Sequence, residues 1–138
     1  MTATFRIVGF AVLATALLAL ASCQSASRAP TQPTGKSAAL RTMEQVASAA
    51  HKCWIASKDP AFRPYQMANE LNNFGGTPRF LLVPARHYGG KPLLVVQATG
   101  NSSRVDVFGP LMGEALGSRI SADITRWQGG NSSCSSEA

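Results

Sequence analysis

Residues 79–98 carry the signal that decides the fold, and they read Arg79-Phe-Leu-Leu-Val-Pro-Ala-Arg-His-Tyr-Gly-Gly-Lys-Pro-Leu-Leu-Val-Val-Gln-Ala98. The two halves, 79–85 and 92–98, are short runs of large aliphatic and β-branched residues, which is typical of buried strands. The segment between them, 86–91, is polar and contains Gly89-Gly90, a pair that favours reversal of the chain. These features predict a β-hairpin.

Two alternating segments flank this hairpin. Residues 65–71 place Tyr65, Met67 and Leu71 on one side of an extended chain, with polar or small residues between them. Residues 103–108 alternate in the same way. Turns rich in Asn and Gly separate both segments from the hairpin. We therefore expect four strands that form an antiparallel meander.

One helix is predicted before the meander in the sequence and another after it. Residues 38–57 carry apolar residues at spacings of three and four, and Lys58-Asp59-Pro60 ends the pattern. A second helix is expected from Ser118 to Trp127, with Ser118 as its N-cap. Gly129-Gly130 ends this second helix.

The expected fold is therefore a small α+β domain over residues 38–138, with an N-terminal helix, a four-stranded antiparallel meander and a C-terminal helix. The two middle strands are apolar on both sides, and such strands are usually covered on both faces of the sheet. Either the helices cover one face each, or the sheet is partly closed, or both helices share one face. The last arrangement leaves an apolar surface, which is normally a binding site.

The first residues of the chain follow the pattern of an export signal. Arg6 supplies a positive charge, and residues 7–20 form an uninterrupted run of apolar and small residues. A helix of this length spans about 21 Å, less than the ~30 Å hydrocarbon core of a membrane. The run is therefore too short for a transmembrane anchor, and it fits the apolar part of a signal peptide.

The run leads directly into Leu20-Ala21-Ser22-Cys23. This sequence resembles the lipobox of bacterial lipoproteins, in which an aliphatic residue and two small residues precede a cysteine. The resemblance covers only residues 1–23. It implies that residues 1–22 are a signal peptide, that the chain is cleaved before Cys23, and that this cysteine carries acyl chains such as palmitate. The alternatives are an ordinary cleavable signal with an incidental cysteine and an uncleaved short anchor.

The lipobox resemblance also implies a location in the cell envelope. Gln24, and not Asp, follows the cysteine, which in bacteria with two membranes implies the periplasmic face of the outer membrane. Residues 23–37 have no large apolar side chain and contain Pro30 and Pro33. This composition is typical of a flexible tether between a lipid anchor and a folded domain.

The other two cysteines, Cys53 and Cys134, are predicted to form a disulfide. An even number of cysteines in an oxidising compartment favours pairing. The alternative is a pair of free thiols, or a redox-active Cys53. The sequence contains no Cys-x-x-Cys motif, which disfavours redox chemistry.

The exported part of the chain is moderately basic. Of the 13 basic residues only Arg6 lies in residues 1–22, and all seven acidic residues lie beyond, which leaves a net charge of +5. Solubility alone explains such an excess; the alternative is binding of an anionic ligand. The hairpin and the predicted strand ends supply a candidate surface for a partner or ligand, made of Arg79, Arg86, Lys91, Val95 and Arg104.

No motif in the sequence indicates catalysis, a cofactor or a metal site. His51 and His87 have no cysteine or carboxylate at metal-ligand spacing. No Gly-x-Ser-x-Gly motif is present, and no spacing of carboxylates selects an acid–base pair. Export also argues against nucleic acid as a partner. We therefore expect a chain that is not an enzyme.

The expected function is that of a membrane-anchored, non-enzymatic accessory module. Its partner is expected to be another envelope protein, docked on the face or the edge of the sheet. The alternative is a module that binds lipid or glycan with an apolar face and the basic residues around it. A small envelope enzyme is a third alternative.

Overall fold

The computed structural model describes residues 35–135. The predicted signal peptide, Cys23 and most of the predicted tether lie outside these residues. The described elements, in chain order, are α1 (Ala38–Ala50), the π-helix η1 (His51–Ala56), β1 (Tyr65–Glu70), β2 (Arg79–Pro84), β3 (Leu94–Ala98), β4 (Val105–Phe108), the 3-10 helix η2 (Pro110–Gly113) and α2 (Gly117–Gln128). Every predicted helix and strand is present, and all bounds agree within two residues.

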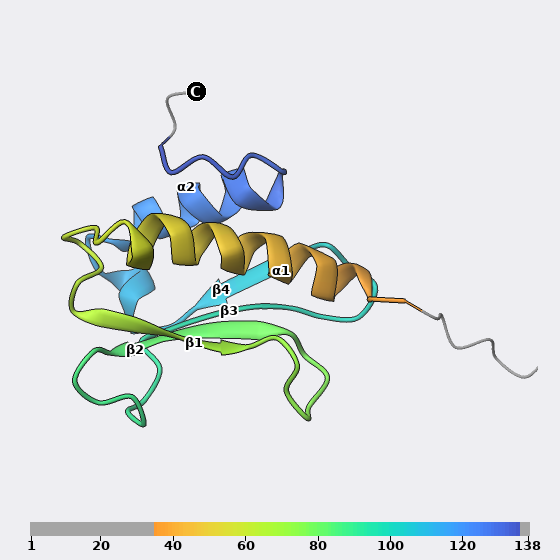
Figure 1. Ribbon diagram of the computed structural model, residues 1–138, viewed down its shortest axis with the longest axis horizontal. Coiled ribbons are helices and arrows are strands. Elements are labelled where there is room, and N and C mark those ends of the chain that lie inside the picture. The colour runs from red at the N-terminus through yellow and green to blue at the C-terminus, as the bar shows by residue number, and fades with distance from the viewer. Residues whose placement is uncertain (1–34, 136–138) are drawn as a thin grey trace, which may run out of the picture. The chain divides into compact units, whose positions relative to one another are not determined.

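The four strands form one antiparallel sheet in the order β1-β2-β3-β4, which is the predicted meander (Figure 1). In the central hairpin, Phe80 lies opposite Val96 and Leu82 lies opposite Leu94. Directly opposed residues point to the same face of a sheet. These four side chains are fully buried, so one face of the central hairpin forms the floor of the core.

The first helix begins where the sequence predicts. The Ser37 hydroxyl accepts a hydrogen bond from the backbone N–H of Leu40 at 3.1 Å, which caps α1. The helix continues without a break into η1, which carries the buried residues Cys53 and Trp54. Lys58 then adopts a positive φ of 58°, which ends the helical path just before Pro60.

The second helix starts differently from the prediction. Its N-cap residue is Leu116, and Ser118 lies inside the first turn, so the prediction that Ser118 caps the helix was wrong. The cause is the close packing of Gly117 on η2. A Cβ atom at residue 117 would lie only 2.4 Å from the Met112 carbonyl oxygen. Only glycine permits this approach, and the helix therefore begins one residue before the serine.

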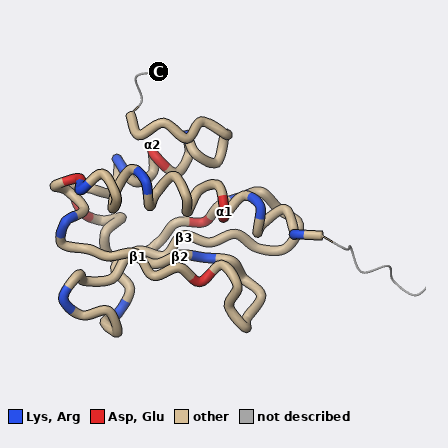
Figure 2. The backbone as a smooth tube through the Cα atoms, in the orientation of Figure 1, with Lys and Arg blue, Asp and Glu red and all other residues tan. Residues whose placement is uncertain are grey.

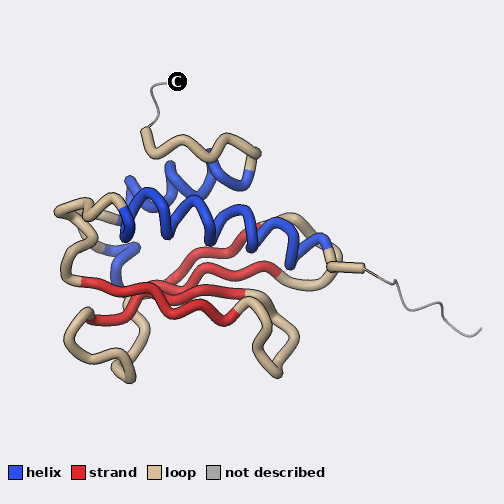
Figure 3. The backbone as a smooth tube through the Cα atoms, in the orientation of Figure 1, coloured by secondary structure: helices blue, strands red, loops and turns tan. Residues whose placement is uncertain are grey.

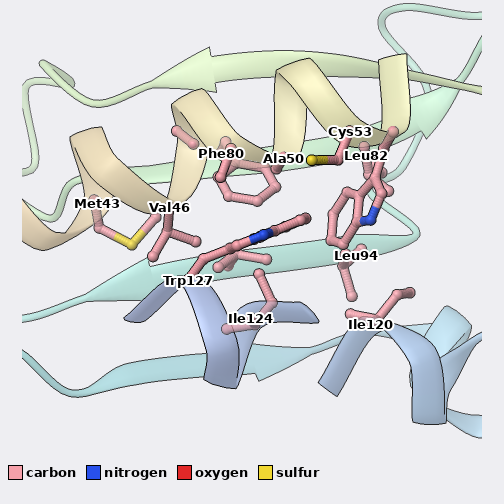
Figure 4. Close-up of a cluster of buried hydrophobic side chains, with 14 of the residues drawn as sticks. Met43, Val46, Ala50, Cys53, Phe80, Leu82, Leu94, Ile120, Ile124 and Trp127 are labelled. Atoms are coloured by element: carbon pink, nitrogen blue, oxygen red, sulfur yellow. The ribbon is translucent and has the colours of Figure 1, made fainter. Parts of the chain in front are cut away.

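Both helices lie on the same face of the sheet, which resolves the question that the sequence left open (Figures 1 and 3). They pack side by side, with α1 against β3 and β4 and α2 against β4. Figure 4 shows their apolar side chains meeting those of the strands. The core that they form includes Met43, Val46, Ala50, Cys53, Trp54, Phe80, Leu82, Leu94, Val96, Ile120, Ile124 and Trp127. The opposite face of the sheet has no helix over it (Figure 3).

The predicted disulfide is present. Cys53 and Cys134 are bonded, with their Cα atoms 5.1 Å apart, and the bond joins η1 to the tail that follows α2. The tail is also held by hydrogen bonds to its backbone carbonyls. The Trp127 indole N–H donates to Ser133 at 2.8 Å, and the Lys52 ammonium donates to Ser132 at 2.9 Å. The two helices are thus linked covalently at one end of the domain.

Removing the disulfide should destabilise the domain strongly. Cys134→Ser opens a loop of 81 residues, and chain entropy alone assigns such a bond about 4 kcal/mol. We expect the melting temperature of the full-length chain to fall by on the order of 15–30 °C under oxidising conditions. Reduced wild type is the control and should melt with the variant. Equal melting of oxidised wild type and variant would contradict this role for the bond.

Candidate functional site

The face of the sheet that points away from the helices carries a continuous row of apolar side chains. Ala68 lies opposite Leu81, Leu81 opposite Val95, and Val95 opposite Phe108. We call these four residues the apolar row, and it crosses all four strands. Ala68 is 7 % exposed, Leu81 and Val95 are half-buried, and Phe108 is 48 % exposed. Solvent therefore reaches the apolar row mainly at the β3 and β4 side.

A row of polar side chains runs beside the apolar row on the same face. It consists of Glu70, Arg79, Gln97 and Asp106, which are also paired across the strands. The Arg79 guanidinium lies 2.6 Å from the Glu70 carboxylate, so the two charges compensate each other. The uncovered face thus combines an apolar strip with a hydrogen-bonding strip, which is the usual composition of a protein-binding surface.

Exposed aromatic residues border the same face. The β1–β2 loop and the β2–β3 loop both extend on the side of the sheet that lies away from the helices (Figure 1). Phe74 in the first loop is fully exposed, and Tyr88 in the second loop is 61 % exposed. Together with Phe108 they are the large hydrophobic side chains most exposed within residues 35–135. Phe74 could not be recognised from the sequence as a surface residue of interest, because one aromatic residue in a turn gives no periodic signal.

The five residues predicted for a binding surface fall into two separate groups. Val95 belongs to the apolar row and Arg79 to the polar row beside it. Arg104 lies just before β4, where its guanidinium is 3.4 Å from the Asp106 carboxylate. Arg86 and Lys91 instead lie in the β2–β3 loop and have no ion pair with any described residue. The structure therefore does not bring these five residues together on one surface.

Uncompensated positive charge collects at the end of the domain that carries the β2–β3 loop (Figure 2). Besides Arg86 and Lys91 it includes Lys58 and Arg63, which also lack an ion-pair partner among the described residues. A hollow of about 500 Å³ lies here, lined by Pro60, Arg63, Pro64, Pro84, Ala85 and Arg86. We call the four cations the basic end. The basic end includes two arginines, Arg63 and Arg86, from loops that are distant in sequence.

A buried carboxylate binds the two helical segments to each other. Asp123 of α2 is only 4 % exposed. It accepts a hydrogen bond of 2.8 Å from the Trp54 indole N–H and another from the Arg126 guanidinium. Asp123 lies four residues after Arg119 and three before Arg126, spacings that favour ion pairs on one helix, but no sequence pattern indicates its bond to Trp54. Because its oxygens are engaged in this way, the arrangement supports a structural role for Asp123.

A second polar contact joins α2 to the N-terminal half of the domain. It is formed by Arg119 of α2 and Asp59, which lies in the segment after η1. The Arg119 guanidinium donates a hydrogen bond to the Asp59 carboxylate. This bond is the main cause that lowers the pKa of Asp59 below its ordinary value of 3.8, and burial opposes it. The same bond raises the pKa of Arg119. The pair therefore holds both groups in their charged forms.

The structure brings no metal-binding set together in the described part of the chain. No group of three or more His, Cys, Asp or Glu side chains there is arranged to hold an ion. His51 is exposed on η1 and His87 is exposed in the β2–β3 loop. Within residues 35–135, no helix combines the length and the hydrophobicity that crossing a membrane requires.

Comparison with known proteins gives no family for the chain. No protein-family model, curated protein or solved structure matches it.

Asp59→Asn tests the ion pair through its pH dependence. We expect the variant to lose at most about 1 kcal/mol of unfolding free energy at pH 7, because the pair is partly exposed to solvent. A carboxylate whose folded pKa is lowered stabilises the fold above its unfolded pKa, here 3.8, and this stabilisation disappears as pH falls through the folded pKa.

Urea unfolding of wild type and Asp59→Asn across this pH range gives the measurement. The difference between them should be present at pH 7 and absent well below pH 3.8. Glu44→Gln, which removes the more exposed pair with Lys36, is the control and should change stability less. A difference between wild type and Asp59→Asn that persists unchanged at the lowest pH would contradict the assignment.

Proposed function

We propose that this chain is a lipid-anchored protein of the bacterial envelope that acts as a non-enzymatic, protein-binding accessory module. The observation that carries the proposal is the apolar row on the uncovered face of the sheet. Apolar residues across all four strands, left without a covering helix, favour a docked partner.

The composition of the uncovered face supports a protein as that partner. Aromatic residues are enriched at protein interfaces and supply much of their binding energy. Phe108 lies at the end of the apolar row, and Phe74 and Tyr88 are exposed on the two loops that border the face. The polar row beside them offers hydrogen-bonding groups for the partner's backbone or side chains.

The anchoring part of the proposal comes from the lipobox resemblance at Cys23. In the described domain, α1 begins at the end of the sheet opposite the β2–β3 loop (Figure 1). Two or three acyl chains on Cys23 would hold the protein stably at the membrane surface.

The second candidate is a lipid- or glycan-binding module, and the basic end is the observation that favours it. Arg63 and Arg86 border a hollow that is otherwise lined by prolines and an alanine. Such a site combines positive charge with apolar walls and suits an anionic head group or sugar polymer.

Photo-crosslinking in living cells separates the two candidates. A photoreactive amino acid at Val95, on the apolar row, should give one dominant protein adduct. The same amino acid at Ser121, an exposed position on α2, is the matched control and should not give that adduct. Equal adducts from both positions would contradict docking on the uncovered face. Adducts only to lipid or glycan would favour the second candidate.

Cys23→Ser tests the anchor. The variant should keep residues 1–22 and fail to incorporate radiolabelled palmitate, because the acceptor thiol is absent. The mass of the purified chain and the label in the membrane fraction give the measurement. Processing and labelling equal to those of the wild type would contradict the lipid anchor.

A further inference from the structure

β1 is an edge strand whose outer backbone groups have no partner. The backbone N–H of Ala85 donates to the Pro64 carbonyl at 2.8 Å, and hydrogen-bonded pairs alternate along antiparallel strands. Residues 66, 68 and 70 therefore bond to β2, whereas the N–H and C=O groups of Met67 and Asn69 point outward. No backbone hydrogen bond from elsewhere in residues 35–135 reaches these outward groups.

A groove lies along this edge, between β1 and the first helical segment. It has a volume of about 370 Å³, and we call it the edge groove; its walls are Glu44, Ala47, Ser48, His51, Met67, Asn69 and Leu71. Met67 and Asn69 thus present free backbone groups at the edge and side chains in the groove. A strand added to β1 would place every second side chain in this groove, since side chains alternate along a strand.

The charge along the edge is uneven. At the end of β1 near Glu70, each carboxylate has a cationic partner: Arg79 pairs with Glu70, and Lys36 pairs with Glu44. At the opposite end, Lys58 and Arg63 have no ion pair. These two cations line a second hollow of about 290 Å³ beside the start of β1. Asp59 also lines this hollow, but its carboxylate already accepts a hydrogen bond from Arg119.

This pattern favours an acidic segment over a second copy of the chain. Among the carboxylates of the described residues, all but Glu114 are engaged in ion pairs. Glu114 lies directly after η2 and not on β1. A second β1 would therefore bring backbone groups to the edge but no free carboxylate to Lys58 and Arg63.

We propose that the edge groove binds an extended segment of a partner protein as a fifth strand on β1, with acidic residues of that segment beside Lys58 and Arg63. The proposal rests on the protein-binding function proposed above and specifies the chemistry of the partner. The backbone of the added segment forms hydrogen bonds with Met67 and Asn69. Its alternate side chains enter the edge groove, and its carboxylates lie beside Lys58 and Arg63.

Selection of peptides from a random 12-residue phage library tests this proposal. The target is the purified full-length chain in detergent. Enriched peptides should alternate apolar and polar residues and carry Asp or Glu at one end. Selection of peptides without this pattern, or enrichment of none, would overturn the proposal.

Asn69→Pro removes one outward N–H without removing a bond to β2, and edge strands tolerate proline at such a position. It should weaken binding of the selected peptides at least about tenfold, because one backbone bond is lost and the ring obstructs the edge. Asn69→Ala is the matched control, since it loses the same side chain but keeps the N–H, and should bind within about threefold of wild type. Equal binding to Asn69→Pro and wild type would overturn the proposal.

Arg63→Glu gives a second test that does not depend on the strand. Arg63 is exposed and has no ion pair, so its replacement should leave the melting temperature unchanged. The variant should bind the acidic peptides at least about tenfold more weakly than wild type, whereas Arg104→Glu should not. Equal loss in both variants would contradict a local role for Arg63.

The outcome of the Val95 crosslink keeps this inference distinct from the proposed function. A Val95 protein adduct that forms equally in wild type and Asn69→Pro, with no acidic peptides selected, would overturn the edge inference alone. If no protein adduct formed from residue 95 in an otherwise wild-type chain, docking on the uncovered face would be overturned instead. A wild-type dimer that becomes monomeric in Asn69→Pro would assign the edge to a second copy and overturn the acidic segment.

Discussion

The structure depends on the side chain of Trp54. This residue is 1 % exposed and lies where the first helix, the sheet and the second helix meet. Its ring stacks on Phe62 with centroids 4.5 Å apart, and it contacts Phe80 of β2 and Trp127 of α2 at 6.3 and 5.0 Å. A buried aromatic residue of this size typically stabilises a fold by about 3–5 kcal/mol relative to alanine.

The indole N–H of Trp54 also forms a hydrogen bond that fixes how α2 packs on it. Its indole N–H needs a partner when buried, and Asp123 of α2 supplies it at 2.8 Å. The adjacent Cys53 is bonded to Cys134 in the tail after α2. Two neighbouring residues of η1 thus fix α2 beside α1, on the same face of the sheet. The one-sided arrangement leaves the apolar row without a helix over it and the edge of β1 without a neighbouring strand in the described domain.

Much of this fold could be predicted from the sequence, because its signals are local. The apolar runs of 79–98 and the three-and-four spacing of 38–57 each follow from one segment. The disulfide was predictable from the number of cysteines and from the start of the sequence, whose pattern predicts export. The start of α2 was not, because it depends on the contact between Gly117 and the Met112 carbonyl in η2.

The candidate surfaces were less predictable because they depend on how distant segments meet. Strands that are apolar on both sides do not reveal which face the helices cover. The bond between Trp54 and Asp123 joins residues 69 positions apart, and no periodic pattern announces it. Val95 was correctly placed on a strand. Arg79 begins β2, whereas Arg86 lies in the loop that follows the other end of β2, and this separates the two arginines.

One measurement tests most directly whether the sheet has a free edge beside its one-sided core. Amide hydrogen exchange along β1, recorded by NMR on the full-length chain in detergent, reports which backbone N–H groups are bonded. We predict alternation, with fast exchange at Met67 and Asn69 and slow exchange at Gln66 and Ala68. Equal protection of all four amides would show that the edge is already occupied and would contradict the account.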